Sequence, residues 1–311
     1  MKERKLVNYR QAPPKLLKNG PQMNKLSFTL LPLVFWTSCV SSKQQDLWQG
    51  RPPPGEIPVV QAGGDPRGRV LDPLRITDVA CPTLTVYKPA HPDGRAIVVC
   101  PGGAYSKLSV VKDGLHVGER FNRDGITIFV LNYRVPVKLT NSAEAAPRQD
   151  LAEALRQARD EMKSLGFPQA KVGVMGFSAG GHLALAGAYG KMPEGAPRPD
   201  FVIAVYPAYL VNGKKESLIE KDFSFSAASP PACFIHSSDD YCLPDGSVLI
   251  WKHLQEFKVP AEMHIFRSGG HGYGISDESL GHSAHNWPDI ALDWMHFEPA
   301  AGGVQTPTAK P

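Results

Sequence analysis

A serine stands between a predicted strand and a predicted helix, within the sequence GFSAG of residues 176–180. The apolar run 171–175 precedes it and the apolar run 183–188 follows, which is the strand–turn–helix context of a nucleophile elbow. Such a tight turn needs small residues on both sides of the serine. The helix that follows directs free backbone N–H groups to the place where negative charge develops during acyl transfer. Ser178 is therefore the predicted nucleophile.

An acid and a histidine follow the serine in the order that this arrangement requires. The apolar stretch 232–236 leads to Asp239 and Asp240, and His271 lies in a glycine-rich segment one predicted helix and one predicted strand further on. Both side chains would then reach the C-terminal edge of a parallel sheet. We predict that His271 takes the proton of Ser178 and that Asp240 orients the imidazole. Asp239 is the rival acid.

A glycine-rich loop supplies candidate donors for an oxyanion hole. The apolar run 96–100 is typical of a buried parallel strand, and it leads directly into PGGAY at residues 101–105. Glycine lets the backbone approach a reacting carbonyl and present its N–H groups. The backbone N–H groups of Gly103, Ala104 and Ala179 are the predicted oxyanion hole. A plain Pro-Gly-Gly turn is the alternative.

Several other side chains near these segments allow two interpretations. Tyr105 and Tyr273 are predicted to form part of the substrate pocket, although aromatic packing would explain them as well. Arg134 and Asp150 flank one connection, where a structural ion pair is favoured over substrate binding. His182 and His236 are expected to be structural hydrogen-bonding residues. His282 and His285 are rival candidates for the base, but no predicted strand precedes them.

Predicted strands and helices alternate along most of the chain. Strands are expected near 84–88, 96–100, 126–132, 171–176, 201–206, 232–237 and 261–266, and helices near 112–123, 146–165, 179–189, 246–257 and 286–297. This alternation predicts an α/β fold with a mostly parallel twisted sheet and helices on both faces. No insertion is long enough for a large lid, so the predicted cap is minimal, built from 46–80 and 211–230.

Charge and composition fit one catalytic domain. At 311 residues with 42% apolar residues, the chain has ample material for a single α/β core. Basic residues within 1–25 account for the net charge of +4, and the remainder is weakly acidic, so nothing indicates nucleic-acid binding. We expect a leader at 1–38, a catalytic domain at 39–300 whose first part, 39–50, is a tether and N-terminal arm, and a disordered tail at 301–311.

The leader predicts export. The apolar run Leu26 to Trp36 is too short to span a bilayer comfortably but suits the core of a signal peptide, with Met23 as an alternative start. Thr37 and Ser38 before Cys39 resemble a bacterial lipoprotein cleavage site. We therefore expect a periplasmic or outer-surface protein, with a lipidated Cys39 as the candidate membrane tether. A disordered basic tail with one apolar patch is the alternative.

The remaining cysteines indicate neither a disulfide scaffold nor a metal centre. Cys100 and Cys233 lie in apolar predicted strands and are expected to be buried, whereas Cys242 could pair with another thiol. No C-x-x-C or His–Cys spacing is present, so no metal is expected.

Taken together, these motifs resemble the α/β-hydrolase superfamily, and more narrowly the bacterial carbohydrate esterases often labelled acetyl xylan esterases. The resemblance covers residues 46–297 and includes LWQG, RITDV, PTLTVY, PGGAY, GFSAGGHLA and GGHGYG. It implies removal of acetyl or other short acyl groups from carbohydrate through a Ser-His-Asp acyl-enzyme mechanism, without metal or organic cofactor. Two departures concern Ala104, where a third glycine is frequent, and Tyr273, where phenylalanine is common.

Three classes of function remain open at this point. The first is the carbohydrate esterase just described, with a feruloyl or general esterase as a close variant. The second is a peptidase on the same catalytic plan, against which the lack of an N-terminal propeller domain counts. The third is a hydrolase fold that binds without catalysis, which would have no need of a complete set of catalytic groups.

Overall fold

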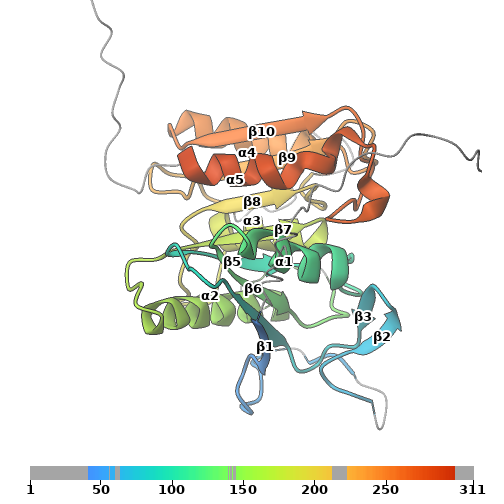
Figure 1. Ribbon diagram of the computed structural model, residues 1–311, viewed down its shortest axis with the longest axis vertical. Helices are drawn as coiled ribbons and strands as arrows, with labels where there is room; N and C mark the ends of the chain where they lie inside the picture. Colours follow the sequence, from blue (N-terminus) through green and yellow to red (C-terminus); the bar gives the residue numbers. More distant parts are fainter. Residues whose placement is uncertain are drawn as a thin grey trace, which may run out of the picture. The chain divides into compact units, whose positions relative to one another are not determined.

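An eight-stranded sheet runs through the protein in the order β1-β4-β6-β5-β7-β8-β9-β10 (Figure 1). β1 pairs antiparallel with β4, and β4 with β6, whereas all the other neighbours are parallel. The mostly parallel α/β fold predicted from the sequence is therefore confirmed. The strands are β1 (Ser41–Asp46), β4 (Thr83–Lys88), β5 (Arg95–Cys100), β6 (Thr127–Asn132), β7 (Lys171–Phe177), β8 (Val202–Val205), β9 (Ala232–Ser237) and β10 (Ala261–Phe266).

The computed structural model describes residues 41–55, 57–59, 64–138, 140, 142, 145–211 and 223–297. The predicted leader, Cys39 and the predicted tail lie outside these residues, as does most of the candidate cap segment 211–230. Within the described ranges, no helix is both long and apolar enough to cross a bilayer.

Helices cover both faces of the sheet. The helices are α1 (His116–Asn122), α2 (Ala146–Ser164), α3 (Ala179–Tyr189), α4 (Asp245–Glu256) and α5 (Trp287–Phe297). Alternate residues of β5 divide between two apolar clusters, with Val98 packing in the cluster of α2, α3 and α4, and Val99 in the cluster of α1 and α5. Because helices cover both faces of the sheet, the central strands are continuous apolar runs in the sequence, and for this reason they could be predicted.

Three features near the N-terminus differ from the expected layout. The segment predicted as a tether forms edge strand β1, whose polar residues carry no apolar alternation that would have predicted it. The candidate cap segment 46–80 contains a hairpin of β2 (Arg69–Asp72) and β3 (Arg75–Thr77). The helix expected at 112–123 begins as a π-helical turn, Val111–Leu115, and continues as α1. The wider turn places Asp113 in the interior, where only 2% of it is exposed.

A buried ion pair fastens the N-terminal arm to the core. The Arg134 guanidinium lies 2.8 Å from the Asp150 carboxylate, and both side chains are fully buried. The Trp48 indole N–H donates to the same carboxylate at 3.0 Å, and Arg134 also donates to the carbonyl of Pro54 at 2.5 Å. The pair expected to be structural is thus formed, and it links residues that are far apart in the sequence.

Removal of one partner of this pair should be strongly destabilising. Arg134→Ala leaves the Asp150 carboxylate buried without its countercharge, so we expect the free energy of unfolding to fall by about 3–5 kcal/mol. Arg120→Ala is the control, because its ion pairs with Asp124 and Asp289 are partly exposed to solvent and each should contribute at most about 1 kcal/mol. Urea denaturation of both variants measures the difference. Equal losses would contradict the assigned role of the buried pair.

Candidate active site

Four loops meet at one edge of the sheet, each following the C-terminal end of a parallel strand. They follow β5, β7, β9 and β10, and they carry the oxyanion-hole candidates, Ser178, Asp240 and His271 respectively (Figure 1). This is the edge at which open α/β sheets bind their ligands. The topology therefore brings together residues that lie far apart in the sequence.

The turn at Ser178 is sharp and strained. Ser178 has φ 52° and ψ −117°, a backbone conformation that non-glycine residues rarely adopt. Two glycines allow the close contacts around it: a Cβ at Gly176 would lie 2.1 Å from the carbonyl oxygen of Gly180, and one at Gly180 would lie 2.0 Å from that of Cys100. The small residues predicted for this turn are thus required by backbone contacts on both sides of the serine.

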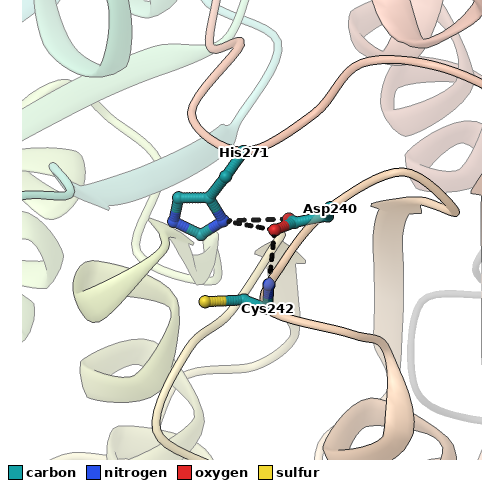
Figure 2. A group of neighbouring side chains, drawn as sticks. All are labelled: Asp240, Cys242 and His271. Carbon is teal, nitrogen blue, oxygen red and sulfur yellow. Dashed lines mark hydrogen bonds and ion pairs between the residues drawn. The ribbon is translucent and has the colours of Figure 1, made fainter.

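Ser178, His271 and Asp240 form an unbroken chain of hydrogen bonds. Ser178 Oγ lies 2.8 Å from His271 Nε2, and His271 Nδ1 lies 2.9 Å from each carboxylate oxygen of Asp240. The Asp240 carboxylate is fully buried, and 11% of the His271 side chain is exposed. The backbone N–H of Cys242 donates to Asp240 Oδ1 at 2.7 Å and so helps to fix the carboxylate (Figure 2). This geometry can deprotonate a serine for attack on an acyl carbon.

The two neighbouring aspartates do different things. Asp239 is exposed and accepts hydrogen bonds from the backbone N–H groups of Gly269 and Gly270, at 3.0 and 2.8 Å. Those bonds, that of Gly270 first, lower the pKa of the Asp239 carboxyl. Asp240 is the aspartate that contacts His271, whereas Asp239 shapes the loop that leads to it.

The predicted oxyanion donors lie in strained or helix-initial backbone. Gly103 has φ +142° and Ala104 φ +56°, so the loop does accommodate a Cβ at the position where a third glycine is frequent. The described structure gives the N–H groups of Gly103 and Ala104 no protein acceptor. Ala179 is the first residue of α3, so its N–H has no acceptor within the helix. Their service as an oxyanion hole stays a prediction.

A buried carboxylate that no motif indicated joins two of these loops. Asp113 accepts the backbone N–H of Gly102 through Oδ2 at 3.1 Å and the hydroxyl of Tyr206 through Oδ1 at 3.1 Å. The Tyr206 hydroxyl in turn accepts the backbone N–H of Gly274, at 2.9 Å. Asp113 therefore connects the loop after β5, which carries the predicted donors Gly103 and Ala104, to the loop of His271. Burial raises the pKa of its carboxyl to about 6.

Among the described residues, the rings of Tyr206 and Tyr241 contact that of His271, and the sequence analysis singled out neither. Tyr105 and Tyr273 are each 5% exposed, which favours packing over broad substrate contact; their substrate-binding role stays a prediction. The Tyr206 ring lies 5.2 Å from the His271 ring and 4.5 Å from that of Tyr273. Tyr241 was not singled out in the sequence, yet its ring lies 4.7 Å from His271 and 80% of the residue is exposed.

The other histidines do not reach the serine. His182 Nδ1 lies 2.8 Å from the Tyr105 hydroxyl, and His236 Nε2 lies 2.8 Å from Ser247 Oγ. Burial lowers the pKa of His182 to about 3 and that of His236 to about 4, so both rings are neutral. The exposed His282 precedes a short 3₁₀ helix, Ser283–Asn286, that contains the exposed His285. His285 Nδ1 lies 3.0 Å from Ser279 Oγ.

Within the described residues, no disulfide joins any of the four cysteines, Cys81, Cys100, Cys233 and Cys242. The pairing considered for Cys242 is therefore not formed within the described part of the chain. Burial, followed by the charge of Asp240, raises the pKa of the Cys242 thiol to about 11. The thiol is therefore protonated at neutral pH and does not compete with Ser178 as a nucleophile.

Comparison with known proteins gives a consistent set of relatives. The family model BD-FAE matches residues 84–196. An acetylxylan esterase of Xylanibacter ruminicola is 30% identical over 225 residues, which is 65% of this chain and 46% of that protein. The chain spans less than half the length of the curated relatives it matches, 46% and 33%.

Solved structures of two related proteins match most of this chain. An acetyl ester-xyloside bifunctional hydrolase from Caldicellulosiruptor lactoaceticus is 30% identical with a TM-score of 0.55, and the match covers 79% of this chain and 97% of that chain. MGS-M1, an alpha/beta hydrolase enzyme from a Medee basin deep-sea metagenome library, is 26% identical with a TM-score of 0.54, covering 69% and 91%.

Asp113 should give the protein a distinctive pH dependence of stability. Because its pKa is raised from 3.8 to about 6, the folded protein binds a proton between these pH values that the unfolded chain does not bind. Stability from this group therefore increases as pH falls from about 6 towards 4. Asp113→Asn should remove this increase in denaturation curves measured from pH 4 to pH 7.

A second variant distinguishes Asp113 from other carboxyls. The Tyr206 hydroxyl bond lowers the pKa of Asp113, so Tyr206→Phe should raise that pKa and move the increase in stability to higher pH. An unchanged pH profile in both variants would show that Asp113 is not the group responsible.

Proposed function

This chain belongs to the α/β-hydrolase superfamily, and from that premise we propose that it is a serine carboxylesterase that removes acetyl or other short acyl groups from carbohydrate. The observation that carries the proposal is the continuous hydrogen-bonded chain of Ser178, His271 and Asp240. A protein that only binds would not need this arrangement beside a glycine-rich loop with free N–H groups. The geometry therefore favours hydrolysis over the non-catalytic alternative.

The proposed reaction has two steps that share one set of groups. Ser178 Oγ attacks the ester carbonyl carbon while His271 Nε2 takes its proton, and the same proton passes to the leaving sugar oxygen as the C–O bond breaks. Water then attacks the acyl-enzyme, again giving its proton to Nε2, and the acid and free serine are released. Asp240 holds the imidazole orientation throughout and stabilises the imidazolium that forms.

The carbonyl oxygen acquires negative charge in both steps. The N–H groups of Gly103, Ala104 and Ala179 are the proposed donors to it, and loss of one such donor typically lowers the rate about 10²- to 10³-fold. Asp113 supports this role because it fixes Gly102, the residue immediately before the donors. Through Tyr206 and Gly274, Asp113 also fixes the loop that carries His271. The loop of the proposed donors and the loop of the base are therefore held by the same carboxylate.

A carbohydrate substrate is supported by relatives and by one surface feature. Two relatives at 30% identity are an acetylxylan esterase and an acetyl ester-xyloside bifunctional hydrolase. The exposed Tyr241 ring beside His271 offers an apolar face against which a sugar ring can lie while its acyl group reaches Ser178. A feruloyl or general esterase uses the same machinery, and the size of the acyl group distinguishes it from a deacetylase.

Export and membrane tethering form part of the same proposal. They rest on the apolar run Leu26 to Trp36 and on Cys39, which are features of the sequence alone. A polymeric carbohydrate substrate would be met outside the cytoplasm, so the two proposals agree. Mass measurement of the mature protein from a bacterial host tests the cleavage site and the lipid on Cys39.

Acetate release from acetylated xylan tests the proposed substrate. The wild-type protein should release acetate and should also cleave a short-chain nitrophenyl ester. Ser178→Ala should lower both rates on the order of 10⁶-fold while the protein remains folded, because the nucleophile is lost. Cleavage of the nitrophenyl ester alone would support the serine esterase mechanism but would reject acetylated xylan as the substrate. No cleavage of either by folded protein would favour the binding-only alternative.

The two aspartates provide a matched pair of variants. Asp240→Asn should lower kcat on the order of 10⁴-fold, because an amide favours the wrong imidazole tautomer. Asp239→Asn should lower it less than about tenfold, since the amide oxygen can still accept the backbone N–H bonds. Steady-state kinetics on the nitrophenyl ester compares them. Equal losses, or a larger loss for Asp239→Asn, would mean that the wrong acid was assigned.

A further inference from the structure

A third potential metal ligand lies beside the proposed catalytic pair. Within the described residues, one ligand atom each from Asp240, Cys242 and His271 lies within 4.8 Å of the others. Figure 2 shows the Cys242 side chain extending past the carboxylate on the side of the His271 ring. No spacing in the sequence indicated this group, because its members come from loops after β9 and β10 that only the fold brings together.

The three side chains match the ligand preferences of zinc. Zn²⁺ binds thiolate sulfur, imidazole nitrogen and carboxylate oxygen at about 2.0–2.3 Å in a tetrahedral arrangement, so two ligand atoms of one ion lie about 3.3–3.8 Å apart. In the present structure the three ligand atoms lie within 4.8 Å of one another, so binding of the ion draws them closer together. The Asp240 carboxylate and a Cys242 thiolate together carry two negative charges, which balance the charge of the ion in a largely buried site.

From this arrangement we propose that Asp240, Cys242 and His271 form an inhibitory site for a borderline-soft divalent cation of the zinc class. Cys242 is the one ligand whose side chain the ester hydrolysis does not use. The ion displaces the thiol proton, which leaves to solvent, and a water molecule completes the coordination. This metal is an inhibitor and not a cofactor, so it adds no step to the ester hydrolysis.

Binding at either nitrogen of His271 stops the base. If the ion takes Nε2, it occupies the position that receives the proton of Ser178. If it takes Nδ1, the neutral ring carries its proton on Nε2, which can then no longer accept one. In both cases the hydrogen-bonded chain from Ser178 to Asp240 is broken, and chelation of the ion restores it.

Cobalt binding tests the site without any reference to ester hydrolysis. Co²⁺ is added to the full-length protein, and the thiolate-to-cobalt charge-transfer absorption is recorded in the near ultraviolet. The band should form in wild type and in Cys81→Ser, the control at another partly buried thiol. It should be lost in Cys242→Ser. Absence of the band in wild type, or its persistence in Cys242→Ser, overturns the proposal.

Zinc inhibition tests the consequence, which rests on the proposed esterase function. Each variant's rate on the nitrophenyl ester with ZnCl₂ is divided by its own zinc-free rate. Even an outer-shell partner contributes about 10- to 100-fold to metal affinity, so Cys242→Ser should need at least about tenfold more zinc for half inhibition. EDTA should restore the wild-type rate.

Two outcomes of this second experiment separate the site from the function. Equal zinc sensitivity in wild type and Cys242→Ser places the inhibitory ion elsewhere and overturns the proposal. A wild-type cobalt band that Cys242→Ser lacks, in a protein that cleaves no ester, supports the metal site and refutes the esterase function instead.

Discussion

The close approach of the start of α3 to the loop after β5 is the constraint on which the site depends. A Cβ at Gly180 would lie 2.0 Å from the carbonyl oxygen of Cys100, so only glycine permits this spacing. The loop also passes close to the nucleophile, because a Cβ at Gly102 would lie 3.2 Å from Ser178 Cβ. The close approach also holds Ser178 at φ 52°, a conformation that typically costs about 1–3 kcal/mol. The complete burial of α3 offsets that strain.

A second constraint is the burial of a charged carboxylate beneath the loops. Asp113 is removed from water, which raises its pKa, but its oxygens receive a backbone N–H and a tyrosine hydroxyl. Such a group destabilises the fold when charged and specifies a single loop arrangement at the same time. Two local features therefore position the site: the close backbone contact at Gly180 and the buried Asp113 carboxylate. Together they hold the turn at Ser178, the loop after β5 and the loop of His271.

Local patterns explain what the sequence predicted and what it did not. Ser178 lies in a contiguous motif, and the central strands are continuous apolar runs, so both were predictable. Edge strand β1 is polar and is defined only by its pairing with β4. Asp113 and Tyr241 acquire their places through the tertiary fold. Asp113 is buried at a π-helical turn, and the Tyr241 ring lies against His271, which is distant in the sequence. Neither environment leaves a periodic signal in the sequence.

The central claim is that Ser178 is the residue that becomes acylated. Labelling with a fluorophosphonate, followed by peptide mass spectrometry, tests this claim without any assumption about the natural substrate. The account predicts a single covalent adduct on Ser178 that His271→Ala suppresses, because the reagent requires a serine activated by its base. An adduct on a different residue, or no adduct on folded wild-type protein, would contradict it.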